Sequence, residues 1–178
     1  APSGGRDLEI HVLAREASAL SLIEQLQRNT MVRIDMPFGD AHLAELPDGP
    51  LVLIAAGTGM GQVHGLIEHC RAEGFKHPVH LYWGVRRPED FYEIEHWDEW
   101  LKLPNLFLHK VVSDQCGWQG RCGMLHEAVC EDFPDLKALH VYASGSPAMV
   151  YGTLDALVEA GMDAHQMRAD VFAYAPRS

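Results

Sequence analysis

A continuous apolar run followed at once by a glycine-rich turn is the feature that most constrains the fold of this chain. The run PLVLIAA occupies 50–56 and the turn GTGMGQ occupies 57–62. A continuously apolar strand is typical of a parallel sheet that helices cover on both faces. Because glycine lacks Cβ, a turn built on Gly57, Gly59 and Gly61 can adopt positive φ and let a ligand approach the main chain. A helix behind this turn would present free N–H groups and its positive end to a phosphate. The alternative is a tight strand-to-helix turn with no ligand.

The turn differs from two well-defined phosphate loops. Gln62 occupies the place of the third glycine in the dinucleotide fingerprint. No GK[ST] follows, which excludes the phosphate-cradling loop of ATPases. The turn alone therefore indicates a nucleotide site without naming the nucleotide.

Composition and charge exclude several classes of function. The chain has 178 residues, enough for one domain or one domain with an appendage. Its formal net charge is −11 with only 14 lysines and arginines, which argues against nucleic acid as a partner. No apolar run is long enough for a membrane span, and the first residues show no signal-peptide pattern, so we expect no membrane and a cytoplasmic location.

The cysteines and histidines do not form a recognisable metal-binding pattern. The four cysteines contain no CxxC pair, and the eleven histidines are scattered along the chain. We therefore expect no metal site, and we expect free thiols at Cys70, Cys116, Cys122 and Cys130.

Strand-like and helix-like segments alternate from 50 to 174. The predicted strands are 50–56, 79–84, 105–113, 138–145 and 166–174. The predicted helices are about 62–74, 96–103, 124–132 and 147–161. This alternation predicts an α/β fold with an open, doubly wound parallel sheet. Upstream, strands at 8–14 and 31–36 and a helix at 18–29 stand outside the alternation, with a boundary at PDGP, 47–50.

Three unusual loops follow the ends of predicted strands. They are GTGMGQ at 57–62, WGVRR at 83–87 and ASGSP at 143–147. Ligands of open α/β sheets bind outside the carboxyl ends of the strands. We therefore expect the three loops to converge at one edge of the sheet and to form a single site.

Taken together and in order, six motifs resemble a known family. They are DMPFG (35–39), LIAAGTGMGQ (53–62), YWGVRRPEDFY (82–92), GWQGRCG (117–123), YASGSPAMV (142–150) and ADVFAY (169–174). Their order and spacing resemble the nucleotide-binding half of the ferredoxin–NADP reductase superfamily, especially bacterial NAD(P)H:flavin reductases and oxygenase reductase components. The resemblance implies a Rossmann-like NAD(P)H-binding domain at 47–178. It also implies that 1–46 is the C-terminal remnant of a flavin-binding β-barrel domain.

The resemblance also implies which residues contact the nicotinamide cofactor. The turn that receives the pyrophosphate is Gly57, Thr58, Gly59, Met60 and Gly61. The residues that face the adenosine half are Gly84 and Arg86, although Arg86 can equally be a solvated arginine. The loop beside the nicotinamide ring is Gly145, Ser146 and Pro147.

Two side chains are implied to lie near the reacting rings. Ser144 stands where the family often has cysteine, and its hydroxyl can hydrogen-bond near the nicotinamide. Asp170 and Phe172 match an acid and an aromatic residue that lie near the flavin. Asp170 can relay a proton or order water there. The alternative is that Asp170 is a solvent-facing residue of the last strand.

The implied function is hydride transfer from nicotinamide to flavin, followed by electron transfer to an acceptor such as a protein or an iron–sulfur domain. The cofactors would be NADH or NADPH, and FAD or FMN. No RxY[ST] segment occurs in the sequence, so the flavin would be held mainly by residues absent from this chain. The alternative is a stand-alone NAD(P)-binding or nucleotide-sensing module without catalysis.

Overall fold

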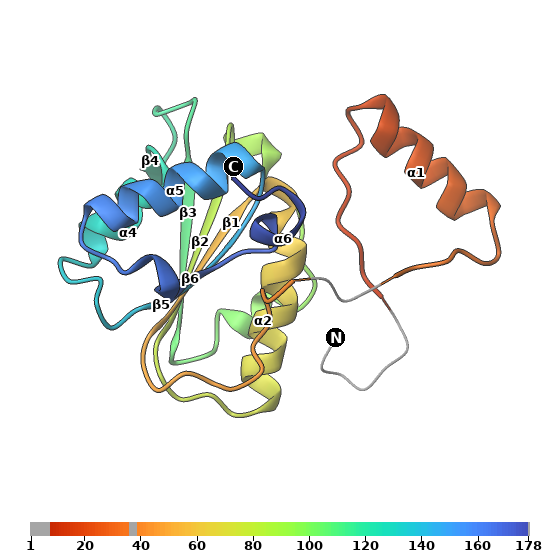
Figure 1. Cartoon of the computed structure of the whole chain (residues 1–178). Helices are drawn as coiled ribbons and strands as arrows, with labels where there is room; N and C mark the ends of the chain where they lie inside the picture. Colours follow the sequence, from red (N-terminus) through yellow and green to blue (C-terminus); the bar gives the residue numbers. More distant parts are fainter. Residues whose placement is uncertain (1–7, 36–38, 178) are drawn as a thin grey trace.

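A six-stranded, all-parallel sheet forms the centre of the molecule, which is described by a computed structural model over residues 8–35 and 39–177 (Figure 1). The strands are β1 (Leu51–Ala56), β2 (Val79–Val85), β3 (Leu106–Val112), β4 (Arg121–Cys122), β5 (His140–Ser144) and β6 (Met167–Arg168). Their order is β4-β3-β2-β1-β5-β6, so the direction of winding reverses between β1 and β5. This confirms the doubly wound parallel sheet.

Helices pack on both faces of the sheet. Side chains of α2 (Met60–Ala72) and α3 (Trp97–Trp100) share one core with Leu51 and Leu53 of β1. Side chains of α4 (Leu125–Asp132) and α5 (Pro147–Glu159) share the other core with Val52 and Ile54. Successive β1 residues therefore enter opposite cores, which explains why this strand is apolar without interruption.

The helix boundaries follow ordinary capping chemistry. The hydroxyl oxygen of Ser146 accepts the N–H of Met149, and Pro147 occupies the first turn of α5. At the other end Gly161 adopts a φ of 101°, a conformation that favours glycine. The predicted helices 62–74 and 96–103 are found as α2 and the shorter α3.

The segment before the sheet differs from expectation. Helix α1 (Ala17–Arg28) is confirmed, but residues 8–14 and 31–35 form no strand, because no neighbouring strand pairs with them in the described chain. Residues 36–38, part of the predicted strand 31–36 and of the DMPFG motif, lie outside the described residues.

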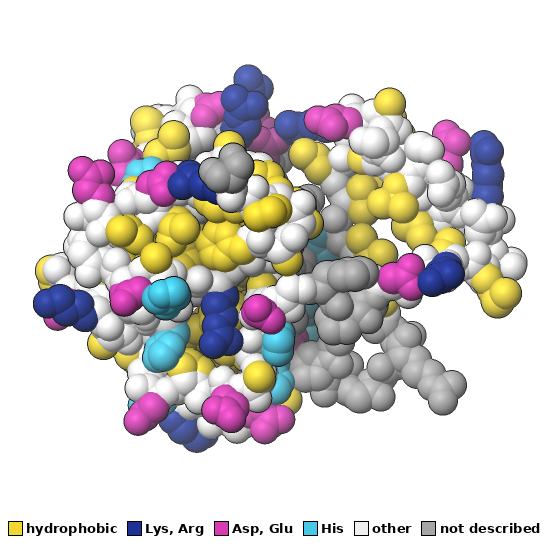
Figure 2. Space-filling model, in the orientation of Figure 1, with side chains coloured by type: hydrophobic (Ala, Val, Ile, Leu, Met, Phe, Trp, Pro, Cys, Tyr) yellow, Lys and Arg dark blue, Asp and Glu magenta, His cyan; other side chains and the backbone are white. Residues whose placement is uncertain are grey.

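Helix α1 lies to one side of the sheet and buries none of its residues (Figure 1). The described N-terminal segment leaves Leu13 55% exposed and Met31 89% exposed. Hydrophobic side chains accordingly reach the surface around α1 in the space-filling view (Figure 2). These residues thus have an amphipathic pattern without a core of their own.

The predicted last strand, 166–174, is wrong beyond its first residues. Strand β6 covers only Met167–Arg168, and α6 (Val171–Tyr174) follows. The Asp170 carboxylate accepts the N–H of Val171 as the helix begins, and Val171 is fully buried. A cap and a buried anchor therefore favour a helical turn here over continued strand pairing.

The loop between β3 and α4 also differs from expectation. It contains the short strand β4, and a disulfide joins Cys116 to Cys122, whose Cα atoms lie 5.1 Å apart. Only Cys70 and Cys130 are free thiols. The expectation of four free thiols is therefore wrong, because the fold of the loop brings two of them together.

Candidate functional site

The three loops that follow β1, β2 and β5 line one cleft of about 720 Å³ at the carboxyl edge of the sheet. Gly57 and Thr58 come from the first loop, Arg86 from the second and Ser146 from the third, and Gly84 lies near the end of β2. The predicted convergence of these loops is therefore confirmed. The cleft lies where the strand order reverses, the usual ligand site of doubly wound sheets.

Gly57 and Gly59 have different roles in the glycine turn. Gly57 has a φ of 53° and open space around its missing Cβ. Gly59 has a helical φ of −55°, and a Cβ there would lie 2.2 Å from the carbonyl oxygen of Ser144. The expectation of positive φ thus holds at Gly57 and is wrong at Gly59 and at Gly61, which lies inside α2. At Gly59, glycine instead allows the turn to pack against the end of β5.

The other predicted residues of the glycine turn and of the loop after β5 lie behind the cleft and do not form its wall. Met60 is fully buried and Ser144 is 6% exposed. A Cβ on Gly61 would lie 3.0 Å from the ring of His11, and a Cβ on Gly145 would lie 2.4 Å from Cε of Met149. Pro147 begins α5.

Three helices begin at the cleft. Met124 and Leu125 at the start of α4 line it, as do Ser146 and Ala148 at the start of α5, while α2 starts directly behind the Gly57 turn. Helix N-termini carry partial positive charge and unpaired N–H groups. The cleft thus fits an anionic ligand, and its volume is in the range of cofactor sites.

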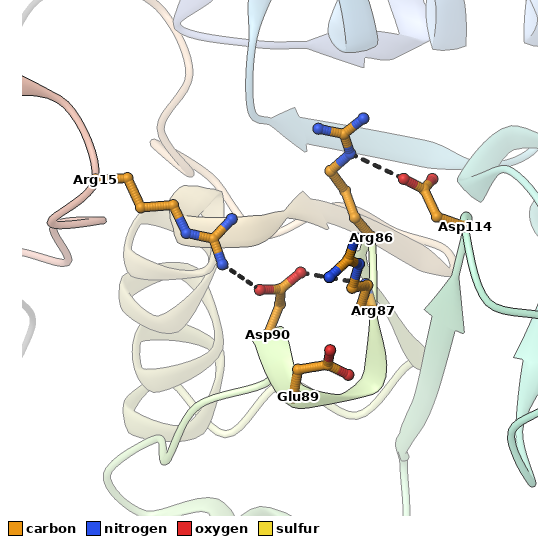
Figure 3. A pocket seen from close by; sticks show the side chains of 6 residues that line it. All are labelled: Arg15, Arg86, Arg87, Glu89, Asp90 and Asp114. Atoms are coloured by element: carbon orange, nitrogen blue, oxygen red, sulfur yellow. Dashed lines mark hydrogen bonds and ion pairs between the residues drawn. The ribbon is translucent and has the colours of Figure 1, made fainter.

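A smaller hollow of about 440 Å³ adjoins the cleft and is rich in charge (Figure 3). It is lined by Arg15, Arg86, Arg87, Glu89, Asp90 and Asp114. Nε of Arg86 donates to Asp114 at 3.1 Å, and the Arg86 side chain is 79% exposed. The hydroxyl of Ser113, together with Arg86, holds the pKa of Asp114 below its usual value. A phosphate would therefore compete with Asp114 for Arg86.

Asp170 and Phe172 are not brought into the cleft. Phe172 lines a separate cavity of about 590 Å³, together with Gly39 and Asp40. Its ring packs against Tyr151 with centroids 5.5 Å apart, and the Asp170 carboxylate caps α6.

Sequence reasoning missed part of the cleft wall. Ser113 lies just after β3 and Gly123 just after β4, and both line the cleft. Gly123 has a φ of 129°. The rule that ligands bind beyond strand ends could have identified Ser113, whereas β4 is too short to be read from the sequence.

The described residues, 8–35 and 39–177, contain no group of three or more His, Cys, Asp or Glu side chains placed to hold a metal ion. Within the same residues no helix has the length and hydrophobicity to cross a bilayer.

Comparison with known proteins identifies the family of this domain. Residues 53–155 match the family model of the oxidoreductase NAD-binding domain. The chain belongs to this family. The match begins within β1, spans the glycine turn and ends within α5.

Several curated relatives of this chain are named as reductases. The chain is 33% identical over 176 residues to the CDP-6-deoxy-L-threo-D-glycero-4-hexulose-3-dehydrase reductase of Yersinia pestis, covering 97% of this chain and 53% of the relative. It is 37% identical over 147 residues to the NAD(P)H-flavin reductase of Vibrio harveyi, covering 78% of this chain and 62% of the relative. The chain thus spans about half the length of the curated relatives it matches.

Among solved structures the NAD-binding domain resembles the cytochrome P450 reductase of Amycolatopsis. The TM-score is 0.67 at 28% identity, with 80% of this chain and 46% of that one covered. Together these likenesses confirm the resemblance to the ferredoxin–NADP reductase superfamily.

Proposed function

We propose that this chain is the NAD(P)H-binding part of a flavin-dependent oxidoreductase, which passes hydride from nicotinamide to flavin and electrons on to an acceptor. One observation carries the proposal. In a domain of the NAD-binding family, the Gly57 turn and the starts of three helices frame a single cleft where the strand order reverses. Several curated relatives are named as reductases, and these names support the direction of the reaction.

Different residues of the cleft would contact different parts of the nucleotide. Gly57 and Thr58 would hold the pyrophosphate, and Gly84 and Arg86 would face the adenosine half. Ser146 at the start of α5 would lie toward the nicotinamide end. When bound, the reduced nicotinamide supplies the hydride, and this chain supplies binding and orientation.

Two further roles are part of the proposal. Ser144 ends β5 directly beneath the glycine turn, so it would shape the nicotinamide end of the cleft. Asp170 would relay a proton or order a water molecule on the flavin side. Its Oδ1 atom accepts the N–H of Val171, and its Oδ2 atom has no hydrogen-bond partner among the described residues, so Oδ2 is the atom assigned this task.

The flavin, FAD or FMN, would lie beyond the second cavity, next to Phe172. We propose that residues 1–46 belong to a flavin-binding domain. A Cβ on Gly39 would lie 2.8 Å from Cβ of Ala173, so the end of this segment packs on α6, beside the cavity that Phe172 lines. The apolar side chains exposed around α1 would then be covered by the remainder of that domain. The proposed acceptor is a protein or an iron–sulfur domain, and the proposed location is the cytoplasm.

Nucleotide titration with a matched pair of glycine variants tests the proposal. Gly57 and Gly74 both have positive φ, 53° and 67°, and both have open space at the missing Cβ. Alanine at either position therefore costs a similar strain of about 1–2 kcal/mol, but only Gly57 lines the cleft. We expect saturable binding of NADH or NADPH by calorimetry, weakened at least fivefold by Gly57→Ala and unchanged by Gly74→Ala.

Flavin dependence is tested on the same protein. We expect a nearly colourless chain that oxidises NAD(P)H slowly, with FMN or FAD added in excess raising the rate. Absence of nucleotide binding, or equal affinity in both glycine variants, would contradict the nucleotide site. Nucleotide binding with no flavin-dependent oxidation under any condition would favour a sensing module instead.

A further inference from the structure

A buried tryptophan is hydrogen-bonded to the glycine turn from beneath. Trp83 lies on β2, is 1% exposed, and donates its indole N–H to the carbonyl oxygen of Gly57 at 3.2 Å. The bond links β2 to the turn that follows β1, and the two strands pair in a register that aligns Trp83 with Ala55. Trp83 does not line the cleft.

The Gly57 carbonyl receives a second hydrogen bond. The N–H of Met60 at the start of α2 also donates to it. A carbonyl oxygen has two lone pairs, so these two donors satisfy it and hold the peptide in one orientation. The peptide in question belongs to the residue with a φ of 53°, whose conformation decides how the turn faces the cleft.

A cation lies against the same indole ring. The ammonium of Lys110 on β3 is 5.6 Å from the ring centre of Trp83 and 4.9 Å from those of Phe91 and Trp97. The ring quadrupole attracts a cation at such distances. A positive charge beside the indole also polarises its N–H and strengthens the bond that it donates.

We propose that Trp83 is a positioning residue for the nicotinamide nucleotide. Its indole N–H holds the Gly57 peptide in the orientation that receives the pyrophosphate, and Lys110 reinforces this bond from β3. The inference rests on the proposed function, because it assigns the pyrophosphate to the Gly57 turn.

The test compares two tryptophan variants within one aromatic cluster. Trp83→Phe keeps a ring but removes the donor, while Trp97→Phe alters a neighbouring ring, whose centroid is 5.8 Å from that of Trp83, without touching the turn. We expect Trp83→Phe to raise the Kd for NADH about fivefold, the usual worth of one hydrogen bond. Trp97→Phe should leave the Kd within twofold. Lys110→Met, which keeps the stem and removes the charge, should raise the Kd about twofold.

A spectroscopic readout separates positioning from general destabilisation. The chain has four tryptophans, so ¹⁵N labelling gives four indole N–H signals, and the Trp83→Phe variant identifies its own. Adding NADH should shift the Trp83 signal more than the Trp97 signal. Equal Kd values for the two variants, or a Trp83 signal that stays fixed while the wild type binds NADH, would overturn the inference alone. No saturable binding of either nucleotide by the wild type would overturn the proposed function, and this inference with it.

Discussion

Replacing Gly59 with alanine should push the glycine turn and the start of α2 away from the end of β5 at the cleft. The added Cβ would lie 2.2 Å from the carbonyl oxygen and 2.6 Å from the carbonyl carbon of Ser144, whereas carbon–oxygen contacts normally begin at about 3.3 Å. Both atoms belong to the backbone, so the overlap of roughly 1 Å can be relieved only by moving α2 away from the end of β5. Gly59 has a helical φ of −55°, so alanine adds no conformational strain and the whole effect is steric.

The expected cost is about 2–3 kcal/mol of unfolding free energy, typical of overpacking against an unyielding wall. In a chain of this length it corresponds to a fall in Tm of roughly 5–10 °C. Gly65 of α2, the helix that begins directly after Gly59, is the control, since nothing lies within 4 Å of its missing Cβ. There alanine should stabilise the protein by up to about 1 kcal/mol, because glycine disfavours helix.

Urea unfolding and calorimetry with NADH measure both consequences. Gly59→Ala should lower stability and weaken nucleotide binding, while Gly65→Ala should do neither. Equal unfolding free energies for Gly59→Ala and Gly65→Ala would refute the close packing of the turn on β5. Normal nucleotide affinity in a destabilised Gly59→Ala protein would refute the link between that packing and the cleft.

Three further predictions concern charge and redox state. Hydrogen bonds from Arg121 hold the pKa of Asp132 at about 2, below its ordinary value of 3.8. The pair between Asp132 and Arg121 therefore contributes its full share of the folding stability above pH 4, and this share is lost as the pH falls toward 2. Urea unfolding should show that Asp132→Asn costs about 1–2 kcal/mol at pH 7 and much less near pH 2, and that Glu131→Gln costs little at either pH. Asp114→Asn removes the carboxylate that pairs with Arg86, so it should lower the Kd for NADPH roughly three- to fivefold and leave the Kd for NADH unchanged. An equal decrease for both nucleotides would count against a 2′-phosphate contact. Thiol titration of the denatured chain should find two reactive thiols before reduction and four after it, and four at the outset would contradict the disulfide.

Local sequence patterns were sufficient for the sheet and for the place of the cleft. The apolar run 50–56 predicts a strand buried on both faces, and the structure places all but its first residue in β1. The three loops follow strand ends, and parallel strands bring their carboxyl ends to one edge, so their convergence follows from topology alone. Pro147 and Gly161 likewise mark the ends of α5 through their own backbone preferences.

Local sequence patterns failed where strand formation depends on a neighbouring strand that the local pattern cannot identify. Residues 8–14 alternate like a strand, yet in the described chain no neighbouring strand supplies the hydrogen bonds. At the C-terminus the strand propensity of 169–174 is outweighed by the Asp170 cap and the burial of Val171. Strand formation depends on distant residues, whereas capping depends on the next few.

The sequence by itself determined which three loops follow the strand ends, where the glycine turn lies and which family these motifs indicate. Only the tertiary structure decided what each residue of the turn does. The requirement for glycine at Gly59 comes from Ser144 on β5, and the orientation of Gly57 depends on Trp83 on β2. Both partners are distant in sequence and adjacent in space, because the parallel sheet places β1 between β2 and β5.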